Sequence, residues 1–206
     1  MSDAPEFVVF DLGGVLVEFS GFTNLPALLG ADFPPDDVRR RWIASPAVCT
    51  FERGGLTGEE FAAAFAREWN LAIAPEDFLE RFAGWAMDFY PGARELVADV
   101  RERVPAACFS NSNPIHWDRN FRRFGIPQSF DRSFASFELG VVKPDAEAFE
   151  LVATRLGCPP QRILFLDDTE VNVEGARRVG YESHLVRGVA EARRVLASRG
   201  LASPSA

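Results

Sequence analysis

Lysine occurs only once in this sequence, at position 143. Of the 22 basic side chains, 21 are arginine, and Lys143 lies in the segment LGVVKPD at residues 139–145. The planar guanidinium of arginine is wider and has a fixed fork geometry, so keeping one lysine suggests a position that requires a compact ammonium group. A surface lysine in a turn, before Pro144 at the start of a helix, explains the same residue equally well. Three other polar clusters help to decide between these interpretations.

Carboxylates follow two short apolar runs of the kind that fully buried parallel strands show. They are Asp11, after FVVF at residues 7–10, and the pair Asp167 and Asp168, after ILFL at residues 163–166. Open α/β sheets place their chemistry at the carboxyl ends of strands. Asp11 can also be interpreted as a turn residue, and one aspartate of the pair as a helix N-cap. Two adjacent carboxylates, however, repel each other and favour a bound cation.

The remaining cluster is SNSN at residues 110–113, after a further strand candidate at 104–109. Serine and asparagine are ordinary turn and N-cap residues, here before Pro114. Together with the carboxylates and the single ammonium, however, they complete the set that phosphoryl transfer requires. A carboxylate can attack phosphorus. A metal ion, a cation and hydrogen-bond donors stabilise the charge on the phosphoryl oxygens.

These residues resemble the haloacid dehalogenase superfamily, and within it the small phosphatases that carry a helical cap. The resemblance extends from residue 7 to about residue 187 and depends on four ordered motifs. These are FDLGGV at 10–15, SNSN at 110–113, GVVKPD at 140–145, and FLDD at 165–168 with Asn172. The resemblance implies that Asp11 forms a phospho-aspartyl intermediate, that Ser110 binds the phosphoryl group, and that Lys143 bridges the nucleophile and the phosphate.

The resemblance also implies a cofactor, Mg²⁺, and a small phosphorylated metabolite as substrate. The implied metal ligands are Asp11, the backbone carbonyl of Gly13 and Asp168, with Asp167 and Asn172 supporting them. Further residues expected to bind phosphate or substrate are Gly14, Asn111 and Ser112. Glycine suits such a position because it lets the backbone approach a ligand closely.

One position departs from the family pattern. Most phosphatases of the superfamily carry a second aspartate two residues after the nucleophile, which protonates the departing alcohol, and this sequence has Gly13 there. A subgroup with Asp-Leu-Gly in this motif is similar to the present chain and is assigned phosphatase activity, with sugar phosphates among its substrates. We therefore expect the same reaction class with a preference for acidic leaving groups, such as those of sugar 1-phosphates.

The elements that must position these residues indicate an α/β fold with a Rossmann-like parallel sheet. From residue 91 onward, helix and strand patterns alternate, which implies parallel crossovers. Helices are expected at about 91–103, 114–124, 145–156, 169–179 and 189–199, and further strands at 132–136 and 181–186. Residues 1–15 and 90–200 would form this catalytic core, and residues 201–206 a frayed tail.

Residues 16–89 contain no good strand candidate and are expected to form an all-helical cap inserted after the first strand. In the best helix, 57–69, Thr57 and Glu60 form a capping box and aromatic residues recur every four positions. A second helix is expected from 75 to about 87. Such a cap can close over the active site on hinges near 13–18 and 85–92. The candidates for substrate specificity are Glu52 and Arg53 of the cap and His116 of the core, together with Trp42, Trp85 and Trp117, for which a core position is more usual.

The composition restricts the partners. A net charge of −8 repels nucleic-acid phosphates and anionic membrane surfaces. The three cysteines are widely spaced and odd in number, which favours reduced, structural thiols. Asp3 and Glu6 lie where a signal peptide would need basic and then apolar residues, and no apolar run approaches the ~20 residues that span a bilayer. We therefore expect a cytoplasmic monomer or homodimer with no nucleic-acid or membrane partner.

Two alternatives to the phosphatase interpretation remain open. A 2-haloacid dehalogenase also forms an aspartyl ester, although carbon–halogen hydrolysis has no use for Asp167, Asp168 and a divalent ion. A phospho-accepting regulatory module similar to a receiver domain also combines acidic residues, a hydroxyl and a lysine. In receivers, however, the acidic pair precedes the phosphorylated aspartate, whereas here it comes last. A catalytically weakened phosphate-binding protein is a related possibility, because of Gly13.

Overall fold

A five-stranded sheet forms the centre of the computed structural model, which describes residues 4–30 and 33–204. The strands are β1 (Phe7–Phe10), β4 (Ala106–Ser110), β5 (Arg132–Ala135), β6 (Ile163–Asp167) and β7 (Glu182–Leu185). Their order is β5-β4-β1-β6-β7, and every neighbouring pair is parallel. The predicted α/β fold with a parallel sheet is therefore confirmed.

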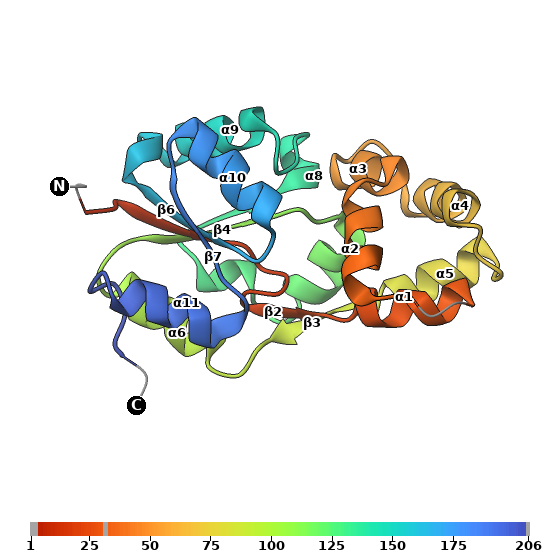
Figure 1. Cartoon of the computed structure of the whole chain (residues 1–206), viewed down its shortest axis with the longest axis horizontal. Coiled ribbons are helices and arrows are strands. Elements are labelled where there is room, and N and C mark those ends of the chain that lie inside the picture. The colour runs from red at the N-terminus through yellow and green to blue at the C-terminus, as the bar shows by residue number, and fades with distance from the viewer. Residues whose placement is uncertain (1–3, 31–32, 205–206) are drawn as a thin grey trace.

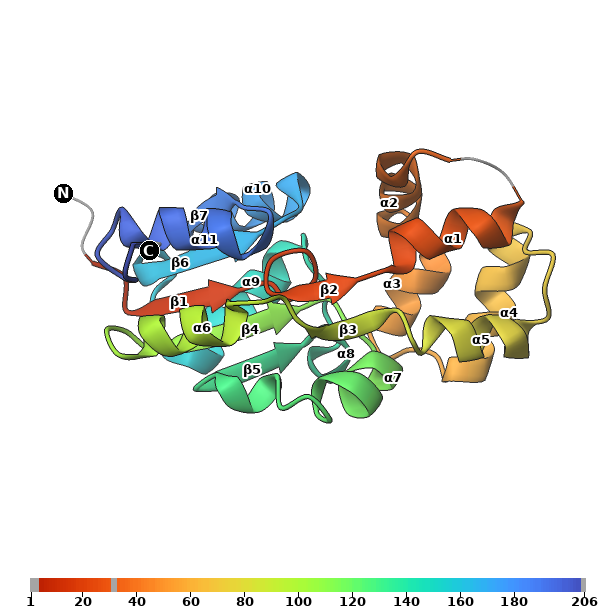
Figure 2. The ribbon, with the colours of Figure 1, turned by 90° about the horizontal axis from the view of Figure 1, so that it is seen from below.

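Helices cover both faces of this sheet (Figures 1 and 2). One face carries α6 (Ala93–Arg101) and α11 (Gly188–Ala197), and the other carries α9 (Ala146–Leu156) and α10 (Glu170–Val179). Residues of β1 alternate between the two hydrophobic cores. Val8 and Phe10 pack with α6 and α11, whereas Val9 packs with α9 and α10. Because both faces are covered, the strand is apolar at every one of these positions.

Five helices form a separate unit beyond the carboxyl ends of the strands (Figures 1 and 2). They are α1 (Gly21–Leu29), α2 (Pro35–Ile43), α3 (Pro46–Glu52), α4 (Gly58–Trp69) and α5 (Pro75–Phe82). Their shared core is aromatic, and Phe65 stacks on Phe78 with ring centroids 4.7 Å apart. The predicted capping box is present at the start of α4, between Thr57 and Glu60. We call this unit the cap.

Two short strands join the cap to the sheet, so the expectation of an all-helical segment at 16–89 was wrong. β2 (Val17–Phe19) and β3 (Ala86–Phe89) pair in antiparallel fashion, and α5 ends at Phe82 instead of continuing to about residue 87. Strands of three and four residues are too short to show a clear period of two. Both chain connections between the cap and the sheet pass through this pair. The boundaries of the cap at 16 and 89 stay a prediction.

Short elements near the strand ends also differ from the expectation. α7 (Pro114–His116) continues into a π-helical turn at Trp117–Phe121, so the helix predicted at 114–124 is irregular. α8 (Ser136–Leu139) directly follows β5 and was not predicted. Two 3₁₀ turns, at Pro127–Ser129 and Pro160–Arg162, complete the elements of the described residues. α7 and α8 follow the carboxyl ends of β4 and β5, at the edge where the polar clusters lie, whereas the two 3₁₀ turns precede β5 and β6.

The start of the predicted tail is packed against the molecule, which corrects the expectation of fraying at 201–206. Leu201 and Ala202 are buried, and the backbone N–H of Ser203 donates to Asp99 Oδ2 at 2.6 Å. Residues 205–206 lie outside the described residues. Within the described ranges, every helix is too short or too polar to cross a membrane.

Candidate active site

Three neighbouring strands end in polar residues on the same edge of the sheet. Asp11 directly follows β1, while Ser110 and Asp167 are the last residues of β4 and β6. In the register of the sheet, Phe10 lies opposite both Cys108 of β4 and Leu166 of β6. The strands on both sides of β1 thus deliver their terminal side chains next to Asp11, as expected for parallel strands.

Lys143 lies at the centre of this edge, and its side chain is 1% exposed. The ammonium donates to Asp11 Oδ1 at 2.9 Å, to Asp167 Oδ2 at 2.7 Å and to the carbonyl of Phe109 at 2.9 Å. All three N–H donors of a lysine are therefore used, in a geometry that a planar guanidinium does not share. Burial alone would lower the pKa of Lys143, but the carboxylates of Asp11 and Asp167 raise it well above its usual value.

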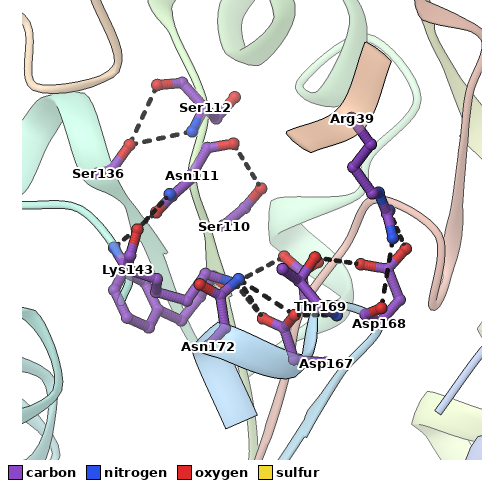
Figure 3. Close-up of polar contacts among 12 residues, drawn as sticks. Arg39, Ser110, Asn111, Ser112, Ser136, Lys143, Asp167, Asp168, Thr169 and Asn172 are labelled. Atoms are coloured by element: carbon purple, nitrogen blue, oxygen red, sulfur yellow. Dashed lines mark hydrogen bonds and ion pairs between the residues drawn. The ribbon is translucent and has the colours of Figure 1, made fainter. Parts of the chain in front are cut away.

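The backbone at Lys143 is held by a reciprocal pair of hydrogen bonds to the SNSN loop. The Lys143 N–H donates to Asn111 Oδ1, and Asn111 Nδ2 donates to the Lys143 carbonyl, each at 2.9 Å (Figure 3). Asn111 therefore fixes the loop that carries the lysine. Its amide is occupied by this contact, so its first role is to position Lys143.

Three buried carboxylates surround the single ammonium. Oxygen atoms of Asp11, Asp167 and Asp168 all lie within 4.8 Å of one another. Burial raises the pKa of Asp11 to about 7, opposed by Lys143 and reinforced by the other two aspartates. Burial also raises the pKa of Asp168, opposed by Arg39. The cluster has more negative than positive charge, and a buried group of this kind favours a bound cation.

The two adjacent aspartates have different surroundings. Asp167 is fully buried, and its carboxylate accepts from Lys143, from the Thr169 N–H at 2.8 Å and from Asn172 Nδ2. Asp168 lines an open cavity instead and pairs with Arg39, which extends toward it from α2 (Figure 3). Asp167 therefore supports the lysine, whereas Asp168 faces the space that a ligand would occupy.

The donor set fits Mg²⁺. Carboxylate and carbonyl oxygens are the ligands that this ion prefers, and the backbone packs tightly around them. A Cβ atom on Gly14, which has φ +73°, would lie 1.9 Å from Asp168 Oδ2. Only glycine allows the backbone to pass so close to the carboxylate. Asp11 and Asp168, with the Gly13 carbonyl, would hold the ion, and Asp167 and Asn172 would support them.

The hydroxyl of Ser110 is almost free of protein contacts. Its best interaction is a long one, to the Asn111 carbonyl at 3.3 Å, although the residue is only 4% exposed. The next hydroxyl-bearing residue is fixed by its backbone, because the Ser112 N–H donates to Ser136 Oγ at 3.0 Å (Figure 3). Ser136 Oγ also lies 2.6 Å from the Glu52 carbonyl, so it connects the SNSN loop with the cap.

A cavity of about 180 Å³ lies between the strand ends and the cap. We call its strand-end residues, Asp11, Ser110, Lys143 and Asp168, the floor. We call three of its cap residues, Arg39, Trp42 and Glu52, the roof. The cavity is also lined by Phe22, Ile43, Val48 and Cys49 of the cap and by Gly14, Asn111, Ser112 and Asn172. Burial raises the pKa of Glu52 to about 8, opposed by a hydrogen bond from Trp42 and by Lys143. The roof thus presents one cation, one aromatic ring and one carboxyl group.

Two residues that were predicted to contact the substrate, His116 and Arg53, have other partners. His116 borders the cavity, but Nε2 lies 2.7 Å from the Phe82 carbonyl and Nδ1 lies 3.1 Å from Asn113 Nδ2. Burial lowers its pKa to about 4. Arg53 does not line the cavity among the described residues and pairs with Asp145 at 2.5 Å. His116 therefore joins α5 to α7, and Arg53 joins the cap to the segment after Lys143.

Sequence reasoning missed three residues of this region. Arg39 is one of three consecutive arginines on α2, and only the structure distinguishes it from its neighbours. Ser136 and Thr169 are small polar residues beside helix starts, where a capping role is the usual expectation. Of the three candidate tryptophans, Trp42 lines the cavity. Trp85 is buried in the core of the cap, and Trp117 is buried in the core that contains α6 and α11.

Several proteins of known name are similar to this chain. Phosphatase MT3486 of Mycobacterium tuberculosis (strain CDC 1551 / Oshkosh) is 29% identical over 188 residues, which are 87% of this chain and 86% of that protein. D-ribitol-5-phosphate phosphatase of Bacteroides thetaiotaomicron is 23% identical over 183 residues, which are 85% of this chain and 89% of that protein. Both similarities extend across the sheet and the cap.

Solved structures share the fold. A HAD family enzyme of Bacteroides thetaiotaomicron, in complex with magnesium and inorganic phosphate, superposes with a TM-score of 0.68 at 21% identity. The match covers 89% of this chain and 95% of that one. A crystal structure of a dehalogenase superposes with a TM-score of 0.69 at 18% identity, over 96% and 98% of the two chains. Residues 6–180 match the haloacid dehalogenase-like hydrolase family. The chain therefore belongs to this family.

Proposed function

We propose that this hydrolase is a Mg²⁺-dependent phosphomonoesterase for a small phosphorylated metabolite. The observation that carries the proposal is the excess of three buried carboxylates, Asp11, Asp167 and Asp168, over the two cations that pair with them, Lys143 and Arg39. Such a site binds a divalent cation and then a phosphate dianion, whereas carbon–halogen hydrolysis needs neither. Relatives named as phosphatases support the same choice.

Each floor residue has a role in this chemistry. Asp11 attacks phosphorus and becomes a phospho-aspartate, which water then hydrolyses. Lys143 holds the attacking carboxylate and neutralises a phosphoryl oxygen, and the nearly free hydroxyl of Ser110 donates to another. When bound at Asp11 and Asp168, Mg²⁺ supplies further charge neutralisation. Fixed partners around these groups keep them in place during the reaction.

The substrate is a small molecule, with sugar 1-phosphates as good candidates. The cavity of about 180 Å³ lies between the strand ends and the cap, and it suits a small phosphorylated molecule. Gly13 supplies no carboxyl group to protonate the departing oxygen, so the floor residues alone favour esters with acidic leaving groups. A location in the cytoplasm and a monomeric or dimeric state remain predictions from the sequence.

Phosphate release in the presence of Mg²⁺ tests the proposal directly. We expect turnover of sugar phosphates or aryl phosphates with Mg²⁺, and none with EDTA or in Asp11→Asn. That variant keeps the volume of the side chain and loses the nucleophile. Asp118→Asn, an exposed change on the same core, serves as the matched control. Full activity of Asp11→Asn would remove the nucleophile assignment. Halide release from 2-haloacids in EDTA would favour the dehalogenase instead.

A further inference from the structure

The floor of the cavity lacks a group that can move a proton to or from the substrate. Position 13 is glycine, and a Cβ built there meets no other atom of the described residues within 4 Å. Asp11 is assigned as the nucleophile and Asp168 to the metal ion, Lys143 is fully engaged, and Ser110 is a weak acid. Hydrolysis of an unactivated ester nevertheless requires a proton for the departing oxygen. The donor must therefore come from another part of the cavity wall.

Among the described residues, four side chains of the cavity wall outside the floor and its supporting loops can exchange protons: Glu18, Cys49, Glu52 and His116. Burial raises the pKa of the Cys49 thiol, which makes it a weaker acid than a carboxyl group. Both ring nitrogens of His116 are already engaged, and the low pKa of the ring keeps it neutral, so it is a poor acid. Glu18 is solvent-exposed on β2, where water competes for its carboxylate. Glu52 is half-buried at the end of α3 and shares the cavity with Asp11 and Lys143.

The loop that carries Glu52 is fixed to the core at three consecutive residues. The Glu52 carbonyl accepts from Ser136 Oγ at 2.6 Å, and Arg53 pairs with Asp145 at 2.5 Å. Gly54 has φ +76°, and a Cβ on it would lie 2.7 Å from the Phe137 carbonyl, so the loop lies directly against α8. Although Glu52 belongs to the cap, its backbone is therefore held relative to the floor.

We infer that Glu52 is the acid and base of the reaction and replaces the carboxyl group that Gly13 lacks. The inference rests on the proposed phosphatase function. As Asp11 forms its bond to phosphorus, the bond between phosphorus and the ester oxygen breaks, and that oxygen takes the proton of the Glu52 carboxyl. The Glu52 carboxylate then takes a proton from water as the water oxygen attacks phosphorus. The bond to Asp11 breaks, phosphate leaves, and Glu52 is protonated again.

The electrostatic surroundings of Glu52 suit both steps. Burial raises its pKa to about 8, Trp42 and Lys143 oppose this rise, and Asp11 adds to it. The other charged or titratable groups that face the cavity are Glu18, Arg39, Cys49, His116 and Asp168. At neutral pH the carboxyl group is mostly protonated and can donate. A pKa close to the working pH also lets the carboxylate act as a base in the second step.

Two substrates of similar shape separate proton transfer from binding. 4-Nitrophenyl phosphate has a leaving group that departs without a proton, whereas benzyl phosphate releases an alcohol that needs one. We expect Glu52→Gln to lower kcat/KM for benzyl phosphate by about 10²–10⁴-fold and kcat/KM for 4-nitrophenyl phosphate by a much smaller factor. The step in which Glu52 acts as base follows the departure of the leaving group and lowers kcat for both substrates. In the wild type, benzyl phosphate turnover should fall as the pH rises through about 8, and this fall should be absent in the variant. Glu59→Gln, exposed on α4, is the matched control.

The outcomes distinguish this inference from the proposed function. An equal loss of kcat/KM on both substrates, or no loss of kcat/KM on either, would overturn the role of Glu52 as proton donor. A leaving-group-dependent loss in Glu18→Gln, with none in Glu52→Gln, would assign the role to Glu18 and overturn the inference as well. Activity of Asp11→Asn on 4-nitrophenyl phosphate would instead contradict the phosphatase mechanism itself. Turnover of 4-nitrophenyl phosphate by Glu52→Gln also shows that the variant is folded.

Discussion

Lys143 on the floor of the cavity and Arg39 on its roof both pair with an aspartate, but their surroundings differ. The Lys143 side chain is 1% exposed and donates to three fixed acceptors, which belong to strands or strand ends of one sheet. The Arg39 side chain is 25% exposed and reaches Asp168 from a helix of the cap. One cation is part of a rigid scaffold, and the other depends on where the cap lies.

The same difference extends to the rest of the two regions. Floor residues and their supports are joined by hydrogen bonds, as between Asn111 and the Lys143 backbone or between Asn172 and Asp167. The roof stands on an aromatic core of its own, and the chain connects it to the sheet through β2 and β3. Its other links to the core are non-covalent contacts of side chains and backbone, such as that of Ser136 with the Glu52 carbonyl. This division suggests that the floor determines the reaction, whereas the roof selects the substrate and can move to admit it.

The largest effect that would test this division is expected at Lys143. Lys143→Arg keeps the charge, but a planar fork cannot donate to Asp11, Asp167 and the Phe109 carbonyl at once. We expect kcat/KM to fall by about 10²–10³-fold on every substrate, as for loss of one electrostatic stabiliser. Arg122→Lys, at an exposed ion pair, is the control and should change little. A loss of kcat/KM on some substrates only would mean that Lys143 contributes to substrate selection.

A smaller effect is expected when the proton donor is moved from roof to floor. In Glu52→Gln, the additional change Gly13→Asp should restore benzyl phosphate turnover by at least about tenfold. The new side chain has room, because a Cβ at Gly13 meets no described atom within 4 Å and φ there lies outside the left-handed region. The measurement is kcat/KM for benzyl and 4-nitrophenyl phosphate in the single and double variants. If benzyl phosphate turnover does not recover in the double variant, the proton donor must lie on the cap side of the substrate.

The smallest effect is expected at the contact between the two regions. Arg39 pairs with Asp168, the aspartate that faces the cavity, so a metal ion must displace it. Removing this partly buried ion pair frees the carboxylate, so Arg39→Gln should strengthen Mg²⁺ binding by about fivefold, which corresponds to about 1 kcal/mol. Isothermal titration without substrate measures this change, with Arg40→Gln, which pairs with Asp37 on the surface, as control. Weaker Mg²⁺ binding in Arg39→Gln would mean that the arginine helps to shape the metal site.

The floor could be predicted from the sequence because its residues follow the strands directly. Asp11 and Asp167 come immediately after, or at the end of, apolar runs that are continuous because both faces of the strand are covered. Parallel strands then bring such ends to one edge whatever the details of the helices. The presence of only one lysine among the 22 basic residues also indicated that position 143 is functional. What the structure contributed was the division of labour between Asp167, which holds Lys143, and Asp168, which faces the cavity.

The roof could not be predicted in the same way, because its contacts join residues far apart in the chain. Arg39 looks like its neighbours Arg40 and Arg41 until α2 is placed against Asp168. β2 and β3 form only because Val17 meets Phe89, and neither segment shows a strand pattern alone. His116 and Arg53 were expected to contact the substrate, but they contact the Phe82 carbonyl and Asp145, respectively, where the cap meets the core.

The buried lysine also allows chemical labelling to measure how often the active site opens. Acylating reagents modify neutral amines, and the ε-amine of Lys143 is held protonated by two carboxylates inside the closed molecule. The chain has no other lysine side chain. An amine-reactive ester therefore finds no ε-amine to label while the sheet edge is intact. The fraction of chains labelled at residue 143, measured by mass spectrometry, then gives the fraction of molecules in which the catalytic centre is disrupted.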